Sequence, residues 1–487
     1  MQERYHKRMR TLAWLGAALL TLAPRALGQA LPDLGSVADT TITPQLERRI
    51  GESVVRDIKS RDPTYLDDPE IEDYLGAMGS RLAQANPGTR QEFDFFVLRD
   101  PSINAFALPG GFVGVNTGLI TMSETESEIA SVMAHELAHV TQRHMARTLA
   151  QQQQMQAPVL AALAAAILLG RSRPDLAVGA ALGAQGAVVQ SQLSYSREFE
   201  READRVGLKT LQAAGFDPRA MAVFFDKLQR ATRLSDDGSV PGYLRTHPLT
   251  TERISDAQGR AAEMPYKQHL DTPEFHLVRA KLRADTGESR DAVALFESSL
   301  REKRYASEAA ARYGLASALL RDRKAKEADA ALARLRATGT VVMVETLAAR
   351  IRVALGDKAG AASLLAAARV KYPHSRPLLY AQVDVLEDSG RPPEALAATA
   401  EPLRQFPRDV RLHAFQSKIY TSLGKRFLQH QSQAEVYALQ GSLPAAIEQL
   451  MLARSADDGD FYQLSVVDAR LKELRAQFAQ ESKDLKR

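Results

Sequence analysis

A glycine-anchored pattern repeats about every 34 residues through the C-terminal half of this 487-residue chain, and this period constrains the fold more than any other feature. Gly287, Gly356 and Gly390 are each followed five residues later by an alanine. Arg323 occupies the same frame, so the successive steps are 36, 33 and 34 residues. Turn residues at this spacing, between stretches rich in Ala and Leu, predict stacked pairs of helices, because one pair cannot bury its apolar face alone.

The period matches the helix–turn–helix unit of the tetratricopeptide repeat. From about residue 270 onward the sequence carries no strand patterns. We therefore expect an all-α tetratricopeptide solenoid over residues 270–487, with a concave surface that binds a protein partner. Gly441 follows Gly424 by only 17 residues, so the last frame is irregular. An unrelated helical bundle is the alternative.

The composition limits the kinds of site and partner. The chain has no cysteine, so any metal must be held by His, Asp or Glu, and a disulfide scaffold is excluded. The formal net charge of +4 comes from residues 1–28, which hold five of the 63 basic and one of the 59 acidic side chains. The remainder is neutral, with 58 of each sign, and this balance predicts no nucleic-acid partner.

The first 28 residues are predicted to be an export signal. Basic residues precede 13 apolar residues, Thr11 to Ala23, and Ala26-Leu27-Gly28 supplies small residues for cleavage after Gly28. The alternative, a membrane anchor, would need about 20 apolar residues. We therefore expect the mature chain in an oxidising periplasm, where the lack of thiols avoids mispairing.

Residues 29–262 mix helix and strand patterns, which predicts an α+β domain that is mostly helical with a small sheet. We expect helices over residues 44–59 and 68–85 and strands over 93–98, 105–108 and 112–115. Pro109-Gly110-Gly111 would join the last two strands in a tight turn. Ser123 and Glu126 have the spacing of a capping box and would open a long helix that continues toward Gln154.

This long helix carries His135-Glu136-Leu137-Ala138-His139. At about 3.6 residues per turn His135 and His139 share one face, so both imidazoles can bind one metal ion. Glu136 projects beside them, where it can act as the general base of a metal-dependent hydrolase. A catalytic zinc normally has three protein ligands and one open position, so a third ligand must come from elsewhere.

The candidate third ligand lies 65 residues after His135, in a segment of helical character that Gly215 would close. Spacing alone leaves the ligand open, because two acidic pairs in this segment are four residues apart. These pairs are Glu198 with Glu202 and Glu200 with Asp204.

Two motifs resemble those of the M48 zinc metallopeptidases, a gluzincin group: His135-Glu136-x-x-His139 and Glu200-x-x-Ala203-Asp204. The stretch from Asn104 to Gly111 is also similar to the strand region before the metal helix of that family. The order of export signal, protease domain and tetratricopeptide tail resembles the periplasmic beta-barrel assembly-enhancing proteases within it. The resemblance implies an exported zinc endopeptidase, with chaperone-like activity, in quality control and assembly of outer-membrane β-barrel proteins.

The same resemblance implies roles for single residues and partners. It predicts one zinc ion per chain, bound by His135, His139 and Glu200, with Glu136 as catalytic base. Asp204 would accept a hydrogen bond from a ligating imidazole. Unfolded or misassembled outer-membrane proteins would be the substrates, and the tail would contact the outer-membrane assembly machinery.

Three further polar residues near these motifs are expected to lie outside the site. His144 follows His139 by five residues, which on a continuous helix places it about 140° from the ligand direction. We therefore expect a structural or surface role for His144, and a solvated helix face for Glu198 and Glu202.

His247 lies before Pro248 in a predicted loop of the same domain. In the M48 family a residue of this region can face the metal. We expect His247 to occupy the open metal position in a latent resting state, and two alternatives remain open. It could instead donate a hydrogen bond to the tetrahedral oxyanion, or it could be solvated and irrelevant.

Other expectations concern whole segments. Residues 157–189, rich in Ala and Gly, are expected to be either a pair of helices packed on the core or a mobile flap or membrane-surface element near the active site, which would make peripheral membrane contact. One strand of the 105–115 hairpin is expected to bind substrate as an added strand. Removing residues 270–487 is expected to leave the metal site intact, because no predicted ligand lies there.

The competing function is a chaperone-like adaptor with a structural metal site and no physiological proteolysis. A structural site would need a fourth permanent ligand. The intact Glu136 argues against this function, because a structural site needs no base.

Overall fold

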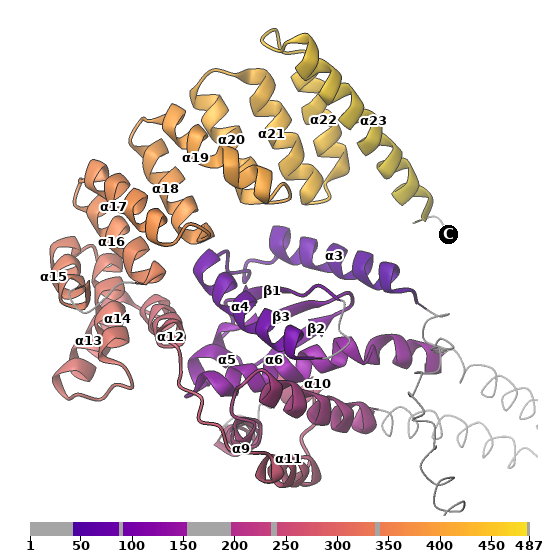
Figure 1. Ribbon diagram of the computed structural model, residues 1–487, viewed down its shortest axis with the longest axis vertical. Helices are drawn as coiled ribbons and strands as arrows, with labels where there is room; N and C mark the ends of the chain where they lie inside the picture. Colours follow the sequence, from indigo (N-terminus) through magenta and orange to yellow (C-terminus); the bar gives the residue numbers. More distant parts are fainter. Residues whose placement is uncertain (1–41, 87–90, 153–195, 235–240, 337–340, 485–487) are drawn as a thin grey trace, which may run out of the picture.

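The computed structural model describes residues 42–86, 91–152, 196–234, 241–336 and 341–484 (Figure 1). The predicted export signal, residues 1–28, and the stretch 157–189 lie outside the described residues. Within the described ranges, no helix combines the length and the apolar character that a membrane span requires.

The first part of the chain is an α+β domain with a small sheet between helices, as predicted (Figure 1). Two further helical stretches cover residues 144–152 and 196–213. The helices predicted over residues 44–59 and 68–85 and the three predicted strands are confirmed to within two residues at each end. Its named elements are α3 (Pro44–Arg61), α4 (Pro69–Ala85), β1 (Asp94–Leu98), β2 (Ala105–Leu108), β3 (Phe112–Asn116), α5 (Thr117–Met122), α6 (Glu126–Thr141), α9 (Arg219–Leu234), α10 (Gly242–Thr246) and α11 (Thr251–Glu263).

The central strand of the sheet is β3, which pairs in parallel with β1 and antiparallel with β2. Gly110 and Gly111 turn β2 into β3 with φ of +78° and +94°, a conformation that glycine adopts without a Cβ clash. The outer side of β1 is covered, because the Leu66 N–H donates to the Val97 carbonyl at 2.9 Å. Among the described residues β2 is therefore the open edge of the sheet, and α6 packs beside it.

Helix α6 carries the His-Glu-x-x-His motif, and the capping box predicted for its start is wrong. The Ser123 hydroxyl donates instead to the Leu119 carbonyl at 2.9 Å, at the end of α5. The Glu126 N–H donates to Oδ1 of Asp271 at 2.8 Å, and the Glu126 carboxylate accepts hydrogen bonds from Thr272. The local box fails because both of its side chains bond elsewhere, and a carboxylate 145 residues away caps the helix.

The end of α6 also differs from the prediction. The helix stops at Thr141 instead of continuing toward Gln154. Arg143 then adopts φ +52°, and helical backbone resumes over residues 144–152. A left-handed residue breaks the regular rotation of the helix. Angles counted from His139 along a continuous helix therefore do not apply beyond this turn.

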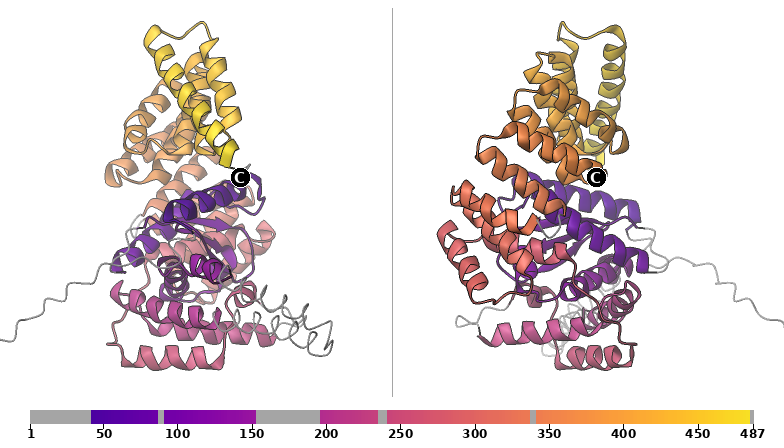
Figure 2. Two further views of the ribbon diagram at one scale, coloured as in Figure 1. Left: turned by 90° about the vertical axis from the view of Figure 1, so that its right-hand side faces the viewer. Right: turned by 60° about the vertical axis from the view of Figure 1, so that its left-hand side comes forward.

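The tail is all-α, and its helices stack into a curved solenoid beside the first domain (Figures 1 and 2). The predicted fold class, an α+β domain followed by a tetratricopeptide solenoid, is confirmed. The helices of the tail are α12 (Pro273–Asp285), α13 (Ser289–Arg301), α14 (Glu308–Arg321), α15 (Ala325–Arg336), α16 (Val342–Ala354), α17 (Lys358–Lys371), α18 (Arg376–Asp388), α19 (Pro392–Gln405), α20 (Val410–Ser422), α21 (Arg426–Leu439), α22 (Leu443–Arg454) and α23 (Phe461–Asp484).

The turns of the repeat frame contain the left-handed residues that the sequence pattern implies. Gly287, Gly356, Gly390 and Gly424 have φ of +63°, +87°, +68° and +69°. Arg323, which occupies the same frame, has φ +62°. These residues follow α12, α14, α16, α18 and α20, so each ends the first helix of a pair.

The core of the first domain continues into the tail. One hydrophobic cluster extends from Ile71 on α4 to Ile351 on α16. Two further clusters, within residues 349–419 and 427–474, belong to the tail alone. Helices α12, α14 and α16 therefore help to hold α4 and α6 in place.

Charged contacts reinforce this junction. The start of α4 is acidic and faces basic side chains of the tail, which lies against it in Figure 1. The ion pairs are Lys281 with Asp68 and Glu70, Arg376 with Asp73, and Arg411 with Asp67.

Candidate metal centre

The two histidines of the motif face each other from adjacent turns of α6. Their Nε2 atoms lie 3.0 Å apart, and His135 is buried while His139 is partly exposed. Both Nε2 atoms therefore point toward one place, as the four-residue spacing predicted.

The helical stretch 196–213 packs closely on α6 because it presents small residues. A Cβ at Gly207 would lie 3.2 Å from the backbone nitrogen of His135, and Ala203 is fully buried. Gly207 was not singled out from the sequence, although a glycine inside a helical pattern indicates a close approach of another backbone.

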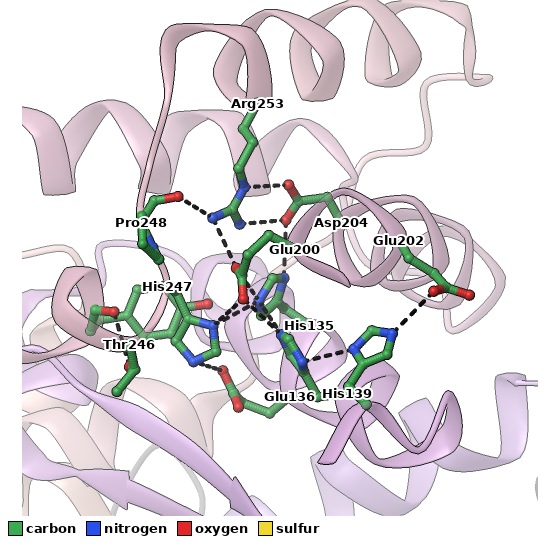
Figure 3. A network of polar contacts seen from close by, with 12 residues as sticks. His135, Glu136, His139, Glu200, Glu202, Asp204, Thr246, His247, Pro248 and Arg253 are labelled. Atoms are coloured by element: carbon green, nitrogen blue, oxygen red, sulfur yellow. Dashed lines mark hydrogen bonds and ion pairs between the residues drawn. The ribbon is translucent and has the colours of Figure 1, made fainter. Parts of the chain in front are cut away.

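This stretch brings Glu200 to the two histidines. Glu200 Oε2 lies 3.4 Å from His135 Nε2, and Oε1 lies 3.4 Å from His139 Nε2 (Figure 3). Glu198 is exposed, as expected for a solvated face. Of the candidates that spacing left open, the structure therefore places Glu200 at the centre.

His247 approaches the same place from the loop between α10 and α11. Its Nδ1 lies 3.0 Å from Glu200 Oε1 and 3.3 Å from His135 Nε2. The side chain is only 10% exposed, and its ring stacks on Tyr243 with centroids 4.6 Å apart. The alternative of a solvated His247 is therefore wrong. One ligand atom from each of His135, His139, Glu200 and His247 lies within 4.8 Å of all the others.

Glu136 lies on the open side of this group. It borders a cavity of about 810 Å³ that the edge strand β2 also lines. Burial raises the pKa of the Glu136 carboxyl. Its Oε1 makes no hydrogen bond to any described residue and lies 3.5 Å from His247 Nε2. A buried carboxyl with a free oxygen beside a cavity can accept a proton there.

Asp204 lies behind His135, where the resemblance to the M48 family predicted it. Its Oδ1 is 3.0 Å from His135 Nδ1, on the side of the ring away from the centre. Arg253 holds both oxygens of Asp204 at 2.7 and 2.8 Å and also lies 2.9 Å from Glu200 Oε2. The same guanidinium donates to the Pro248 carbonyl at 2.8 Å, directly after His247 (Figure 3).

Arg253 was not among the residues that the sequence predicted for the site. It lies in the first turn of α11, 49 residues after Asp204. No spacing rule links it to the motif, so only the packing of α11 against the metal-bearing helices reveals the contact.

The expectations for His144 and Glu202 are corrected by the structure. His144 is buried, and its Nδ1 lies 2.9 Å from Nδ1 of His139. Its Nε2 lies 3.2 Å from Oε2 of Glu202, which also accepts from Arg147 at 2.8 Å. The predicted rotation of His144 away from His139 assumed a continuous helix. The left-handed residue Arg143 interrupts that helix before His144.

Comparison with known proteins identifies the family. A model of peptidase family M48 matches residues 69–261, which include every predicted site residue. A beta-barrel assembly-enhancing protease of Yersinia pestis is 30% identical over 457 residues, which cover 91% of this chain and 91% of its own. The chain belongs to peptidase family M48.

Other M48 relatives match a shorter segment. The beta-barrel assembly-enhancing protease of Escherichia coli is 31% identical over 52% of this chain and 51% of its own. The mitochondrial metalloendopeptidase OMA1 of Schizosaccharomyces pombe is 32% identical over 37% of this chain and 50% of its own. The chain spans about half the length of these two curated relatives in the matched segments.

The electrostatics of the centre fit the zinc site of an M48 enzyme. Burial lowers the pKa of His139 to about 3, which keeps its imidazole neutral. Burial acts the same way on His135, but hydrogen bonds with Asp204 and Glu200 outweigh it and raise its pKa to about 10. Burial likewise opposes the charge of Glu200, yet contacts with His135, His139 and His247 lower its pKa. The surroundings thus favour a positive charge at the centre, and nitrogen and oxygen donors suit zinc.

Proposed function

We propose that the chain is an exported zinc endopeptidase that acts on unfolded or misassembled outer-membrane β-barrel proteins. One observation carries the proposal. Ligand atoms of His135, His139 and Glu200 lie close together, and Glu136 borders the adjoining cavity with one carboxylate oxygen that makes no hydrogen bond to any described residue. The curated relatives named beta-barrel assembly-enhancing proteases support β-barrel proteins as the class of substrate.

The residues divide the work of peptide hydrolysis. Zinc bound by His135, His139 and Glu200 would supply a Lewis acid that polarises the scissile carbonyl. Glu136 takes a proton from the attacking water and passes it to the leaving amine. The raised pKa of Glu136 suits both steps, because a carboxyl with a pKa nearer neutrality holds and releases the proton more evenly.

The edge strand β2 is placed to hold a substrate. Phe106, Ala107 and Leu108 line the cavity that contains Glu136. A peptide added beside β2 would pair its backbone with an open strand edge and lie across the centre. Such binding tolerates many side chains and favours extended, unpaired segments, as in an immature β-barrel. The solenoid tail would bring these clients or the outer-membrane assembly machinery to the protease through its concave face.

A second candidate function rests on His247. If His247 is a permanent fourth ligand, the centre is closed, which is typical of a structural zinc site. The chain would then be a chaperone-like adaptor without physiological proteolysis. The endopeptidase requires Glu136 as a general base, whereas the adaptor does not.

The deciding experiment is the substitution Glu136→Gln in the full chain. Loss of a positioned general base should lower cleavage of an unfolded β-barrel protein by about 10²–10⁴-fold, while the zinc content stays near one ion per chain. Glu198→Gln makes the same chemical change on an exposed side chain, and this variant should cleave the substrate at the wild-type rate. Equal cleavage by wild type and Glu136→Gln would refute the mechanism. Absence of cleavage by zinc-loaded wild type on every unfolded client would favour the adaptor.

A further inference from the structure

A chain of hydrogen-bonding groups extends from His139 away from the centre. His139 Nδ1 lies 2.9 Å from His144 Nδ1, and His144 Nε2 lies 3.2 Å from Glu202 Oε2. Arg147 Nη1 is the last group in this series of contacts and lies 2.8 Å from the same carboxylate oxygen of Glu202. His144 is 4% exposed, and its ring stacks on Phe199 with centroids 4.4 Å apart and an interplanar angle of 14°.

The direction of each hydrogen bond follows from the chemistry of the ends. His139 turns Nε2 toward His135 and Glu200, so a metal bound there requires the lone pair on Nε2 and leaves the proton on Nδ1. That Nδ1–H must donate to His144 Nδ1, because two facing nitrogens share one proton. His144 then carries its own proton on Nε2 and donates it to the carboxylate of Glu202.

The arrangement matches the one behind the other histidine. His135 Nδ1 faces Asp204, and Arg253 holds that carboxylate. Glu202 and Asp204 lie on the same helical stretch as Glu200, and Figure 3 shows them on different sides of the ligands. Each predicted ligand imidazole therefore contacts a carboxylate that also binds an arginine. For His135 this contact is direct, and for His139 it passes through the imidazole of His144.

The backbone is arranged to make this contact. On a continuous helix His144 would point about 140° away from His139. Arg143 adopts φ +52°, which is unfavourable for a residue with a Cβ, and the new helical stretch then presents His144 to His139. The Arg143 guanidinium donates to Glu47 at 3.2 Å and to the Ile42 carbonyl at 2.6 Å, and these contacts hold the turn.

We propose that His144 and Glu202 are positioning residues that fix the tautomer and the ring orientation of His139 for metal binding. The proposal rests on the proposed zinc site and adds two residues to it. Such outer contacts typically change metal affinity by about 10–100-fold.

The test compares two substitutions of His144 in the full chain. His144→Phe keeps a ring to stack on Phe199 but removes the acceptor for His139, so zinc affinity, measured by competition with a chelator, should fall about 10–100-fold. His144→Asn keeps an acceptor near the position of Nδ1 and should recover most of the affinity. The unfolding midpoint of both metal-free variants should equal that of the wild type within a few degrees.

Glu202 is tested in the same way. Glu202→Gln should weaken zinc binding less than His144→Phe, because its amide oxygen still accepts from His144 Nε2. Glu198→Gln, the matched change on an exposed side chain of the same helical stretch, should leave the affinity unchanged.

Long-range ¹⁵N–¹H spectra of the zinc-loaded chain, labelled at histidine, give a direct readout. We expect His139 protonated on Nδ1 and His144 protonated on Nε2. Unchanged affinity in His144→Phe, or a proton on His144 Nδ1, would overturn the proposal. If wild type itself binds no zinc, the proposed function fails instead, so the two failures are distinguishable.

Discussion

At the scale of single residues, His247 has the position with the most consequences. Its Nδ1 faces Glu200 and His135, and its Nε2 faces Glu136. A neutral imidazole in this position can fill the open site of a zinc ion and exclude the attacking water, or it can donate to the oxyanion once substrate is bound. We favour the first role, because the ring already reaches the ligand atoms without a substrate.

The substitution His247→Ala separates these roles by the sign of its effect. If His247 blocks the open position, basal cleavage of a generic unfolded protein should rise. If it donates to the oxyanion, cleavage should fall by about 10²-fold. Initial rates at equal zinc content are the measurement, and Tyr266→Ala, a change of an exposed side chain just after α11, is the control. A fall in rate would rule out latency.

At the scale of elements, the start of α6 depends on a residue from the tail junction. Asp271 accepts the Glu126 N–H, and no side chain of the preceding turn caps the helix. The Glu126 carboxylate in return accepts from His269 and Thr272, so the start of the metal helix and the start of α12 hold each other. Although Glu126, His269 and Asp271 form a group that could bind a metal, these hydrogen bonds already occupy the carboxylate of Glu126.

Removing this cap should therefore destabilise the protein. Asp271→Ala should lower the free energy of unfolding by about 1 kcal/mol, the usual cost of a lost helix cap. Asp271→Asn keeps an acceptor and should lie close to wild type, and Asp329→Ala, on the exposed face of α15, should change stability by less than about 0.5 kcal/mol. Denaturant unfolding of the metal-free chain is the measurement. Equal stability of Asp271→Ala and wild type would show that the contact is not a cap.

At the scale of the whole molecule, the tail is continuous with the protease core. The cluster from Ile71 to Ile351 includes the first helices of the tail, whereas the cluster of residues 427–474 stands apart. Deleting residues 270–487 would remove Asp271 and expose the core at α4 and α5. This finding opposes the expectation that the metal site survives that deletion.

Two truncated chains test the extent of the core. A chain ending at residue 269 should aggregate or unfold without cooperativity and should bind little zinc, because about two fifths of its largest cluster is missing. A chain ending at residue 424 keeps that cluster and should retain cooperative unfolding and full zinc content, while losing α21 to α23. Calorimetry with metal analysis compares them. Cooperative unfolding and full zinc in the shorter chain would contradict the shared core.

The sequence by itself determined those features that depend on neighbours along the chain. The spacing of His135 and His139 placed both rings on one face of a helix, because helical rotation is set locally. The repeat frame located the left-handed turns, even where Arg323 replaces glycine. Short apolar runs, two of them joined by Pro109-Gly110-Gly111, located the strands, and their bounds followed closely.

Tertiary structure alone determined the remaining contacts around the site, because these contacts join segments that no sequence periodicity relates. Arg253 reaches Asp204 across 49 residues, and Asp271 reaches Glu126 across 145. His144 lies only five residues from His139, yet a single left-handed residue reverses its direction, and local rules assume an unbroken helix. Spacing left several acidic residues equivalent as ligands, and the M48-like motif favoured Glu200. The packing of the 196–213 helix on α6 places Glu200 at the centre, since one face of a helix can meet the centre.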